Sequence, residues 1–290
     1  MALLSKIGQK TKEYAVLVMF RHTIFSFSFG IVSLLLTIHY SFSVEKFIIC
    51  VLALLTARTG ANGINRVIDA EIDKRNPRTS VRQIPKGQMS KKEALIFSLI
   101  CLAFTPILAS MLNPLALLLS PVALFFMIIY SYTKRFTPLC HLVLGFTVAM
   151  APAGAWIAMT GTLSFTALFL AAANMFWVAG FDIIYGAQDY DFDTQNGIHS
   201  IPAYFGIAKG LKIAQLFHVI AFLSLVVVGF LTSQFHWIYF TGIAVIGMLF
   251  IIEHRVVKPN HLIHAEIASY NLNELVSIVF LTVGIIDTFI

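Results

Sequence analysis

Segment 65–82 gathers acidic and basic side chains directly after a long apolar run. Asn65, Asp69 and Asp73 recur every four residues, so on a helix one amide and two carboxylates would line a single face. Stacked carboxylates repel one another, and ligation by oxygen alone is typical of Mg²⁺ or Ca²⁺. The spacing therefore predicts a divalent-cation site, with a charged loop between two membrane helices as the alternative. Five basic residues follow that could neutralise the carboxylates or bind a metal-bridged phosphate: Lys74, Arg75, Arg78, Arg82 and Lys86.

Segment 182–197, DIIYGAQDYDFDTQNG, contains a second acidic cluster. On a continuous helix Asp182, Asp189 and Asp193 fall within about 40° of one another, and Tyr185 shares their face. The Asn-Gly dipeptide that follows predicts the end of this helix. Two carboxylate stripes facing across a cavity would hold one or two Mg²⁺ ions, which commonly complete their shell with water and phosphate oxygens. The pair of clusters therefore favours a diphosphate ligand.

Other basic residues could complete such a site. Lys134 and Arg135 lie between the two acidic clusters and are natural phosphate donors, although alone they would simply mark a cytoplasmic loop. Arg58 lies inside an apolar run, two helical turns before Asn65 and on the same face. A charge within a membrane span is a functional candidate by default, and the alternative is an arginine bonded to backbone carbonyls.

The composition indicates the elements that position these residues. Of the 290 residues, 58% are hydrophobic and 12% are charged, which excludes an ordinary soluble domain, where roughly 25% are charged. Runs of about 20 apolar residues can span the hydrocarbon layer. We therefore expect an all-α polytopic membrane protein with nine spans around a central cavity open to the cytoplasmic side: 16–38, 44–64, 93–112, 114–131, 139–159, 163–183, 211–231, 235–253 and 272–289.

Lysine and arginine set the expected orientation. With the N-terminus in the cytoplasm, nearly all basic residues face inward and only Lys46 is clearly outside. The net charge of +6 then reflects membrane anchoring, so we expect no nucleic-acid partner. Segment 1–14 has the pattern of a helix on the inner membrane surface or a frayed tail. The three scattered cysteines are expected to pack, and the loop pair His261 and His264, near Glu266, is expected to be solvated rather than metal-bound.

These residues resemble the motifs of the UbiA superfamily of intramembrane aromatic prenyltransferases. The first motif, Asn-x-x-x-Asp-x-x-x-Asp, stands at 65–73, with Arg66 where many members have another Asp. The second, Asp-x-x-Tyr-x-x-x-Asp-x-x-x-Asp, stands at 182–193, and the intervening Tyr-x-x-x-Lys-Arg begins at Tyr130. The surrounding residues look most like the 4-hydroxybenzoate polyprenyltransferase-like branch, some of whose members serve a futalosine-type menaquinone pathway instead. The resemblance covers nearly the whole chain, so we expect one domain over 1–290 with cytoplasmic motif loops 65–92 and 182–210.

The resemblance implies Mg²⁺-dependent transfer of a polyprenyl group from its diphosphate to an aromatic acceptor in ubiquinone or menaquinone synthesis, in a bacterial inner membrane and without an obligate protein partner. It assigns roles to the matched positions. The expected metal ligands are Asn65, Asp69, Asp73, Asp182, Asp189 and Asp193, and of these Asp69, Asp73, Asp189 and Asp193 are expected to be catalytic. The expected diphosphate ligands are Arg66, Tyr130, Lys134 and Arg135. Arg58 and Tyr185 are expected to bind the acceptor.

Three other functions compete with this interpretation. An ion-coupled transporter would place its acids near the bilayer midplane beside broken helices, whereas here they cluster with basic partners at one membrane face. A CDP-alcohol phosphotransferase would also use carboxylate stripes and Mg²⁺, but its Asp-x-x-Asp-Gly start is absent from the sequence. A non-catalytic quinone-binding scaffold would have little use for two intact carboxylate stripes.

Overall fold

A computed structural model gives the fold and describes residues 10, 13–18, 23–41, 43–262, 264–265 and 268–290. Within these ranges the chain is helical and has no strands, as expected. The helices are α2 (Thr23–Leu36), α3 (Ile38–Ser41), α4 (Val44–Ile68), α5 (Ala70–Arg75), α6 (Lys91–Ser110), α7 (Pro114–Thr133), α8 (Cys140–Thr160), α9 (Phe165–Gly186), η2 (Ala187–Asp189), α10 (Tyr190–Gln195), α11 (Ile201–Phe205), α12 (Ile207–Leu231), α13 (Trp237–Val256), η3 (Ala268–Leu272) and α15 (Asn273–Phe289).

Eight helices in the described part of the chain are long and apolar enough to cross a membrane. The span expected over 16–38 includes residues outside the description, and its described part holds the shorter α2. The ninth span therefore stays a prediction. The surface helix expected over 1–14 also lies mostly outside the described residues, as does Glu266.

Local sequence signals explain where the long helices begin. Ser43, Ser90, Asn113 and Ser164 each accept a hydrogen bond from a backbone N–H in the first turn of α4, α6, α7 and α9. Helices α7 and α8 run through Pro121 and Pro152 without ending, because neighbouring helices support their freed backbone groups. For example, the Val148 carbonyl, which Pro152 leaves without its helical donor, accepts from the Asn174 side-chain amide at 3.2 Å.

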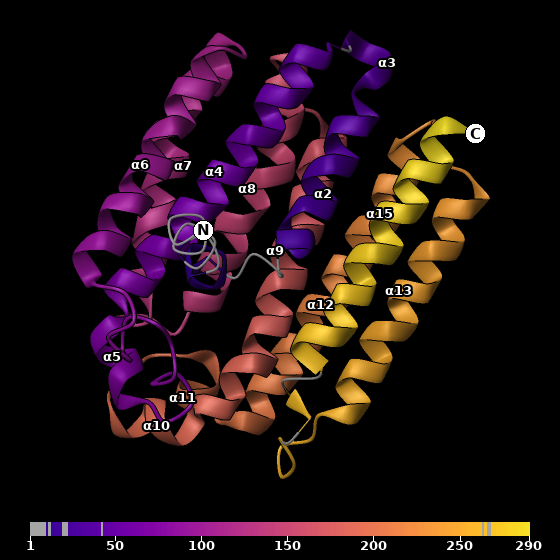
Figure 1. The fold of residues 1–290 in the computed structure, drawn as a ribbon. Helices are drawn as coiled ribbons and strands as arrows, with labels where there is room; N and C mark the ends of the chain where they lie inside the picture. Colours follow the sequence, from indigo (N-terminus) through magenta and orange to yellow (C-terminus); the bar gives the residue numbers. More distant parts are fainter. Residues whose placement is uncertain (1–9, 11–12, 19–22, 42, 263, 266–267) are drawn as a thin grey trace, which may run out of the picture.

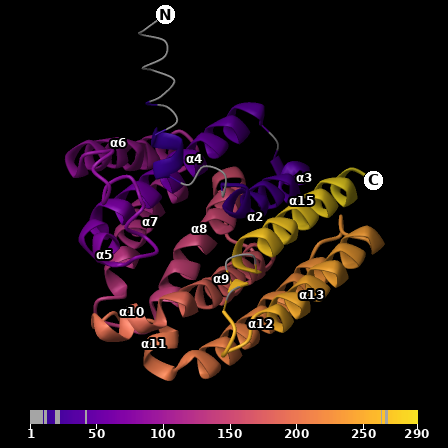
Figure 2. The same cartoon turned by 60° about the horizontal axis from the view of Figure 1, so that its bottom comes forward.

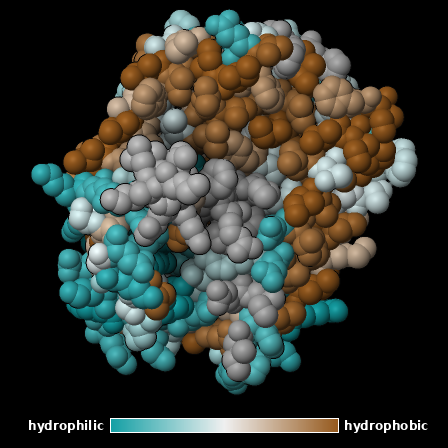
Figure 3. Space-filling model, viewed as in Figure 1, coloured by the Kyte–Doolittle hydropathy of each residue, from teal (hydrophilic) through white to brown (hydrophobic). Residues whose placement is uncertain are grey.

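The long helices run roughly side by side, and the two motif regions lie at the same end of them (Figure 1). Helix α4 packs on α6, α8 on α9, α9 on α12, and α15 on α2. The short helices α5, α10 and α11 gather at the bottom of Figure 1 and come forward together in Figure 2. Hydrophilic residues concentrate at this end, whereas hydrophobic residues cover most of the flank (Figure 3). The acidic clusters thus lie at one face of the membrane-spanning bundle, as the sequence indicated.

Buried aromatic side chains form the core between α2, α9, α13 and α15. The ring of Phe29 stacks on Trp177 and Phe280, with centroids 5.3 and 4.4 Å away. The Trp177 indole N–H donates to Asn273, whose amide in turn donates to the Glu253 carboxyl at 2.9 Å. Burial of the apolar face together with this hydrogen-bonded network fixes α9, which carries the second motif.

Candidate active site

The first motif lies where α4 ends. Helix α4 stops at Ile68, and α5 begins at Ala70. The backbone N–H of Asp69 donates to the Asn65 carbonyl at 2.9 Å, and that of Asp73 donates to the Asp69 carbonyl at 2.8 Å. Helical hydrogen bonding therefore continues through the junction, so the three motif side chains keep the four-residue spacing of a helix. Both carboxylates are buried, at 2% exposure for Asp69 and 4% for Asp73.

The second motif is not one continuous helix, so the expectation of a single helical stripe is wrong. Helix α9 ends at Gly186, a 3₁₀ turn covers Ala187–Asp189, and α10 begins at Tyr190. Asp182 thus lies on α9, Asp189 closes the turn, and Asp193 is buried on α10. A 3₁₀ segment inside a helical stretch is common near functional sites, and such a break is not visible in side-chain periodicity. The end of the helix at the Asn-Gly dipeptide is confirmed, because α10 ends at Gln195 and Gly197 has φ of 64°.

Loop 76–90 connects the two motifs through Arg78. Its Nε donates to Asp189 Oδ1 at 2.9 Å, and its two terminal nitrogens donate to Asp189 Oδ2 and to the Tyr185 hydroxyl. The guanidinium also lies over the Tyr185 ring, 4.4 Å from its centroid. Asn76 adds a hydrogen bond to Asp189 Oδ1 at 2.9 Å. Burial alone would lower the pKa of Arg78, but the bonds to Asp189 outweigh it and raise the pKa, so Arg78 stays charged.

The first motif is neutralised in the same way. The Lys134 ammonium lies 2.7 Å from Asp69 Oδ2, and Arg135 reaches Asp69 Oδ1 at 3.2 Å. Asn65 also donates to Asp69, at 2.9 Å. The Arg82 Nη1 lies 2.7 Å from both oxygens of Asp73. Three carboxylates therefore each have a basic partner, which compensates for burying their charge in the absence of a metal.

The donor set is suited to Mg²⁺, although in this conformation the donors are not gathered around a point. Carboxylate and amide oxygens are the ligands that Mg²⁺ prefers. Within the described ranges, no three acidic, histidine or cysteine side chains stand close enough to hold a metal. Basic side chains occupy the positions beside Asp69, Asp73 and Asp189 instead. Metal binding would therefore have to exchange these ion pairs for coordination.

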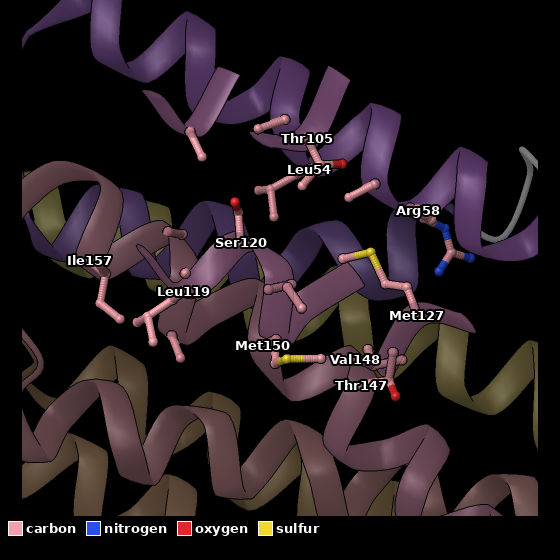
Figure 4. Close-up of a pocket in the computed structure, with 18 of the residues that line it drawn as sticks. Leu54, Arg58, Thr105, Leu119, Ser120, Met127, Thr147, Val148, Met150 and Ile157 are labelled. Atoms are coloured by element: carbon pink, nitrogen blue, oxygen red, sulfur yellow. The ribbon is translucent and has the colours of Figure 1, made fainter. Parts of the chain in front are cut away.

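An apolar cavity of about 390 Å³ extends between α4, α6, α7 and α8. Figure 4 shows Arg58 at one end of its lining and Ile157 at the other. Asn62 lines the cavity one turn after Arg58 and about one turn before Asn65 on α4, and Tyr130, which bonds the Ala61 carbonyl, lines the same end. The remaining lining is mostly aliphatic. The cavity therefore has a polar end next to the first motif and an apolar lining along the rest of its length. Such a cavity suits a ligand that has a charged head and a hydrocarbon tail.

The remaining predicted residues have definite positions. The Tyr130 hydroxyl donates to the Ala61 carbonyl at 3.2 Å, which ties α7 to α4. Arg66 is half-buried near Asp73 and Tyr270, and it forms no ion pair within the described ranges. The two loop histidines, His261 and His264, are exposed, as expected.

Sequence reasoning named Arg78 and Arg82 among five basic residues that could neutralise the carboxylates or bind a metal-bridged phosphate, and it assigned no role to His141. The His141 Nδ1 lies 2.7 Å from Asp182 Oδ2. Its signal was available, because His141 follows the Lys-Arg pair at the start of the next helix, on the same membrane face as the motifs.

Comparison with known proteins decides the family. The profile described as the UbiA prenyltransferase family matches residues 26–274. The chain belongs to this family. It is therefore a membrane-embedded prenyltransferase, and the eight helices in the described part of the chain that could cross a membrane agree with that assignment.

Individual relatives agree with the family. The chain is 33% identical over 190 residues to a 4-hydroxybenzoate octaprenyltransferase from Shewanella pealeana, a match that spans 66% of each chain. An apo UbiA homologue from Aeropyrum pernix K1 superposes with a TM-score of 0.83 at 31% identity, covering 93% of this chain and 98% of that one. An Archaeoglobus fulgidus UbiA homologue bound to GPP and Mg²⁺ has a TM-score of 0.70 at 17% identity, covering 96% of this chain and 100% of the homologue. The last comparison supports the shared fold.

Proposed function

We propose that this protein transfers a polyprenyl group from its diphosphate to an aromatic acceptor of the 4-hydroxybenzoate type, in a Mg²⁺-dependent step of respiratory quinone biosynthesis. The observation that carries the proposal is that the first carboxylate motif lies next to the polar end of the apolar cavity, while Asn76 and Arg78 from the loop after it bond Asp189 of the second motif. The name of the Shewanella relative and the GPP and Mg²⁺ in the Archaeoglobus structure support it. We further propose one domain over 1–290, in a bacterial inner membrane with the N-terminus and both motif loops in the cytoplasm.

The diphosphate would bind between the two motifs. Asn65, Asp69 and Asp73 from one side, and Asp182, Asp189 and Asp193 from the other, would hold Mg²⁺. When bound, Mg²⁺ would neutralise charge on the diphosphate and stabilise its departure. Arg66, which has no ion-pair partner within the described ranges, is placed to donate to phosphate oxygens without first leaving a carboxylate.

The basic residues now paired with carboxylates would change partners when substrate binds. Lys134 and Arg135 are positioned beside Asp69, and Arg78 beside Asp189. Each can turn from carboxylate to phosphate, because both are oxyanions with similar hydrogen-bond geometry. The positive charge would then face the oxygen that leaves with the bonding electrons, which is where negative charge grows in the transition state.

The cavity would receive the prenyl chain and exclude water from the allylic cation. Its aliphatic lining carries few groups that could trap a cation. Tyr130, which lines the cavity, would lie near the reacting carbon, where an aromatic ring lowers the energy of positive charge. A ring carbon ortho to the acceptor hydroxyl would then attack the cation and lose its proton.

Arg58 would bind the acceptor carboxylate. It lines the cavity on α4, two turns before Asn65, so an acceptor held there would meet the prenyl chain rather than the metals. A carboxylate that enters an apolar cavity requires a fixed cation, because burying its charge unpaired would cost several kcal/mol. The guanidinium can grip both carboxylate oxygens and so fix the angle of the ring.

The test is to incubate the purified protein in lipid nanodiscs with radiolabelled polyprenyl diphosphate and a panel of aromatic acceptors, with and without Mg²⁺. We expect the label to appear in a prenylated 4-hydroxybenzoate only when Mg²⁺ is present. Exclusive labelling of a different ring, such as a precursor of the futalosine pathway, would change the assigned acceptor. Absence of product with every acceptor would contradict the proposal.

A further inference from the structure

Asp182 is held differently from the other paired carboxylates of the two motifs. Asp69, Asp73 and Asp189 each pair with lysine or arginine, whereas Asp182 pairs with an imidazole. The His141 Nδ1 lies 2.7 Å from Asp182 Oδ2. The carboxylate accepts, so Nδ1 carries the proton and donates. No other hydrogen bond to the Asp182 carboxylate occurs among the described residues.

The His141 imidazole is closely packed between α8 and α9. His141 is the second residue of α8, is only 4% exposed, and faces α9, along which α8 packs. A Cβ added to Gly186, one turn after Asp182, would lie 3.0 Å from the His141 Cε1. Any side chain at position 186 would therefore push the ring away from Asp182. The absence of a side chain there provides the space that the ring occupies.

The other ring nitrogen makes no competing bond. Nε2 of His141 is buried and has no hydrogen-bond partner in the described part of the chain. The neighbouring Cys140 thiol donates to the His199 carbonyl at 3.4 Å. The bond to Asp182 is thus the interaction that fixes the orientation of the ring, and through it the ring fixes the carboxylate.

This arrangement separates the two oxygens of Asp182. Oδ2 accepts from His141, which leaves Oδ1 for another ligand. Arg78 holds both oxygens of Asp189, and Arg82 holds both oxygens of Asp73, so a metal at either carboxylate must displace the arginine. His141 holds only one oxygen of Asp182, so it can keep its bond while the second oxygen coordinates. Residues that hold metal-binding carboxylates in this manner orient them before the metal arrives.

We propose that His141 is a positioning residue that holds Asp182 in the orientation needed to bind the metal–diphosphate group, both before and after that group binds. This inference rests on the proposed function, because it assumes that Asp182 is a metal ligand. His141 acts through Asp182 and touches neither substrate. Loss of such an outer partner typically lowers metal affinity or activity by about 10–100-fold.

The test compares His141→Ala and His141→Asn with the wild type in nanodiscs. Electron paramagnetic resonance measures the dissociation constant of Mn²⁺, which also prefers oxygen ligands and reports binding without turnover. We expect His141→Ala to weaken Mn²⁺ binding by about 10–100-fold. Asparagine can place an N–H near the former Nδ1, so His141→Asn should recover affinity to within about threefold of wild type.

The matched control is His218→Asn. His218 is also a buried imidazole, 1% exposed, but it bonds the Trp177 carbonyl and His254 rather than a motif carboxylate. We expect this variant to lose thermal stability and to keep the wild-type Mn²⁺ affinity. Equal weakening in His218→Asn and His141→Ala would mean that loss of any buried imidazole disturbs the site, and would overturn the proposal.

A double-mutant cycle tests whether His141 acts through Asp182. Once Asp182→Ala has removed the ligand, His141→Ala should have little further effect on Mn²⁺ affinity, so the two effects should be strongly non-additive. Additive effects, wild-type affinity in His141→Ala, or no recovery in His141→Asn would each refute the positioning role. If His141→Ala does not fold, His141→Leu, which fills more of the space and also lacks an N–H donor, replaces it in both the comparison and the cycle with Asp182→Ala. A wild-type protein that binds no Mn²⁺ and transfers no prenyl group would instead refute the proposed function.

Discussion

Removing Arg78 should make the protein bind a divalent cation more tightly. This arginine holds Asp189 through both carboxylate oxygens, so a metal at Asp189 must first displace it. The variant Arg78→Ala removes that competitor. The same change should weaken diphosphate binding, because Arg78 is one of the cations we assign to the phosphate oxygens.

The expected gain in metal affinity follows from the strength of the Arg78–Asp189 ion pair. Breaking a buried ion pair by removing one partner typically costs about 3–5 kcal/mol. The Asp189 side chain is 15% exposed and keeps its bond from Asn76, which favours the lower end, about 3 kcal/mol. The ligand-free variant is destabilised by about this amount, and metal binding recovers it. At 1.4 kcal/mol per tenfold change, the affinity for Mn²⁺ alone should rise by up to about a hundredfold.

Titration of Mn²⁺ against the purified variants, followed by electron paramagnetic resonance, measures this change. Arg75→Ala is the matched control, because Arg75 is exposed, lies just before the same loop, and among the described residues has a side-chain bond only to the Glu71 carbonyl. It changes the net charge equally without freeing a carboxylate. Unchanged or weaker Mn²⁺ binding in Arg78→Ala, or an equal gain in Arg75→Ala, would refute the reasoning.

Three further predictions concern the substrates. Lys134→Ala should weaken binding of polyprenyl diphosphate by the roughly 1.5–3 kcal/mol of one charged hydrogen bond. In steady-state kinetics this should raise the KM for the diphosphate and leave the acceptor KM almost unchanged. A rise in the acceptor KM alone would reassign Lys134. Arg58→Lys should raise the acceptor KM and lower kcat without affecting diphosphate affinity, and loss of diphosphate affinity would make Arg58 a phosphate ligand. Gly154 lines the cavity and a Cβ there would meet no atom within 4 Å, so Gly154→Phe should fill space and shift preference toward shorter prenyl diphosphates in competition assays. An unchanged chain-length preference would place the tail elsewhere.

The sequence predicted the long helices well because a membrane span requires about 20 consecutive apolar residues, a strong and local signal. The expected span 114–131 corresponds to α7 at Pro114–Thr133, and 235–253 to α13 at Trp237–Val256. The prolines of α7 did not mislead the prediction, since membrane helices tolerate proline better than soluble ones.

The site was less accessible from the sequence, because its contacts are long-range. The four-residue spacing identified Asp69 and Asp73, but nothing local indicates that Arg78 pairs with a carboxylate 111 positions away. The 3₁₀ turn at Ala187–Asp189 changes helical geometry without changing the pattern of residue types. His141 lies 41 positions before Asp182, and the packing of α8 on α9 brings the two side chains together.

The most direct test of the central claim is prenyl transfer to 4-hydroxybenzoate by purified wild-type protein, Asp69→Ala and Asp189→Ala, each measured with Mg²⁺ and with excess chelator. The account predicts product from the wild type only when Mg²⁺ is present. It predicts almost none from either variant, although both remain folded in the membrane. Full turnover by either variant, or by the wild type in excess chelator, would contradict a mechanism in which the two carboxylate motifs hold a metal-bound diphosphate.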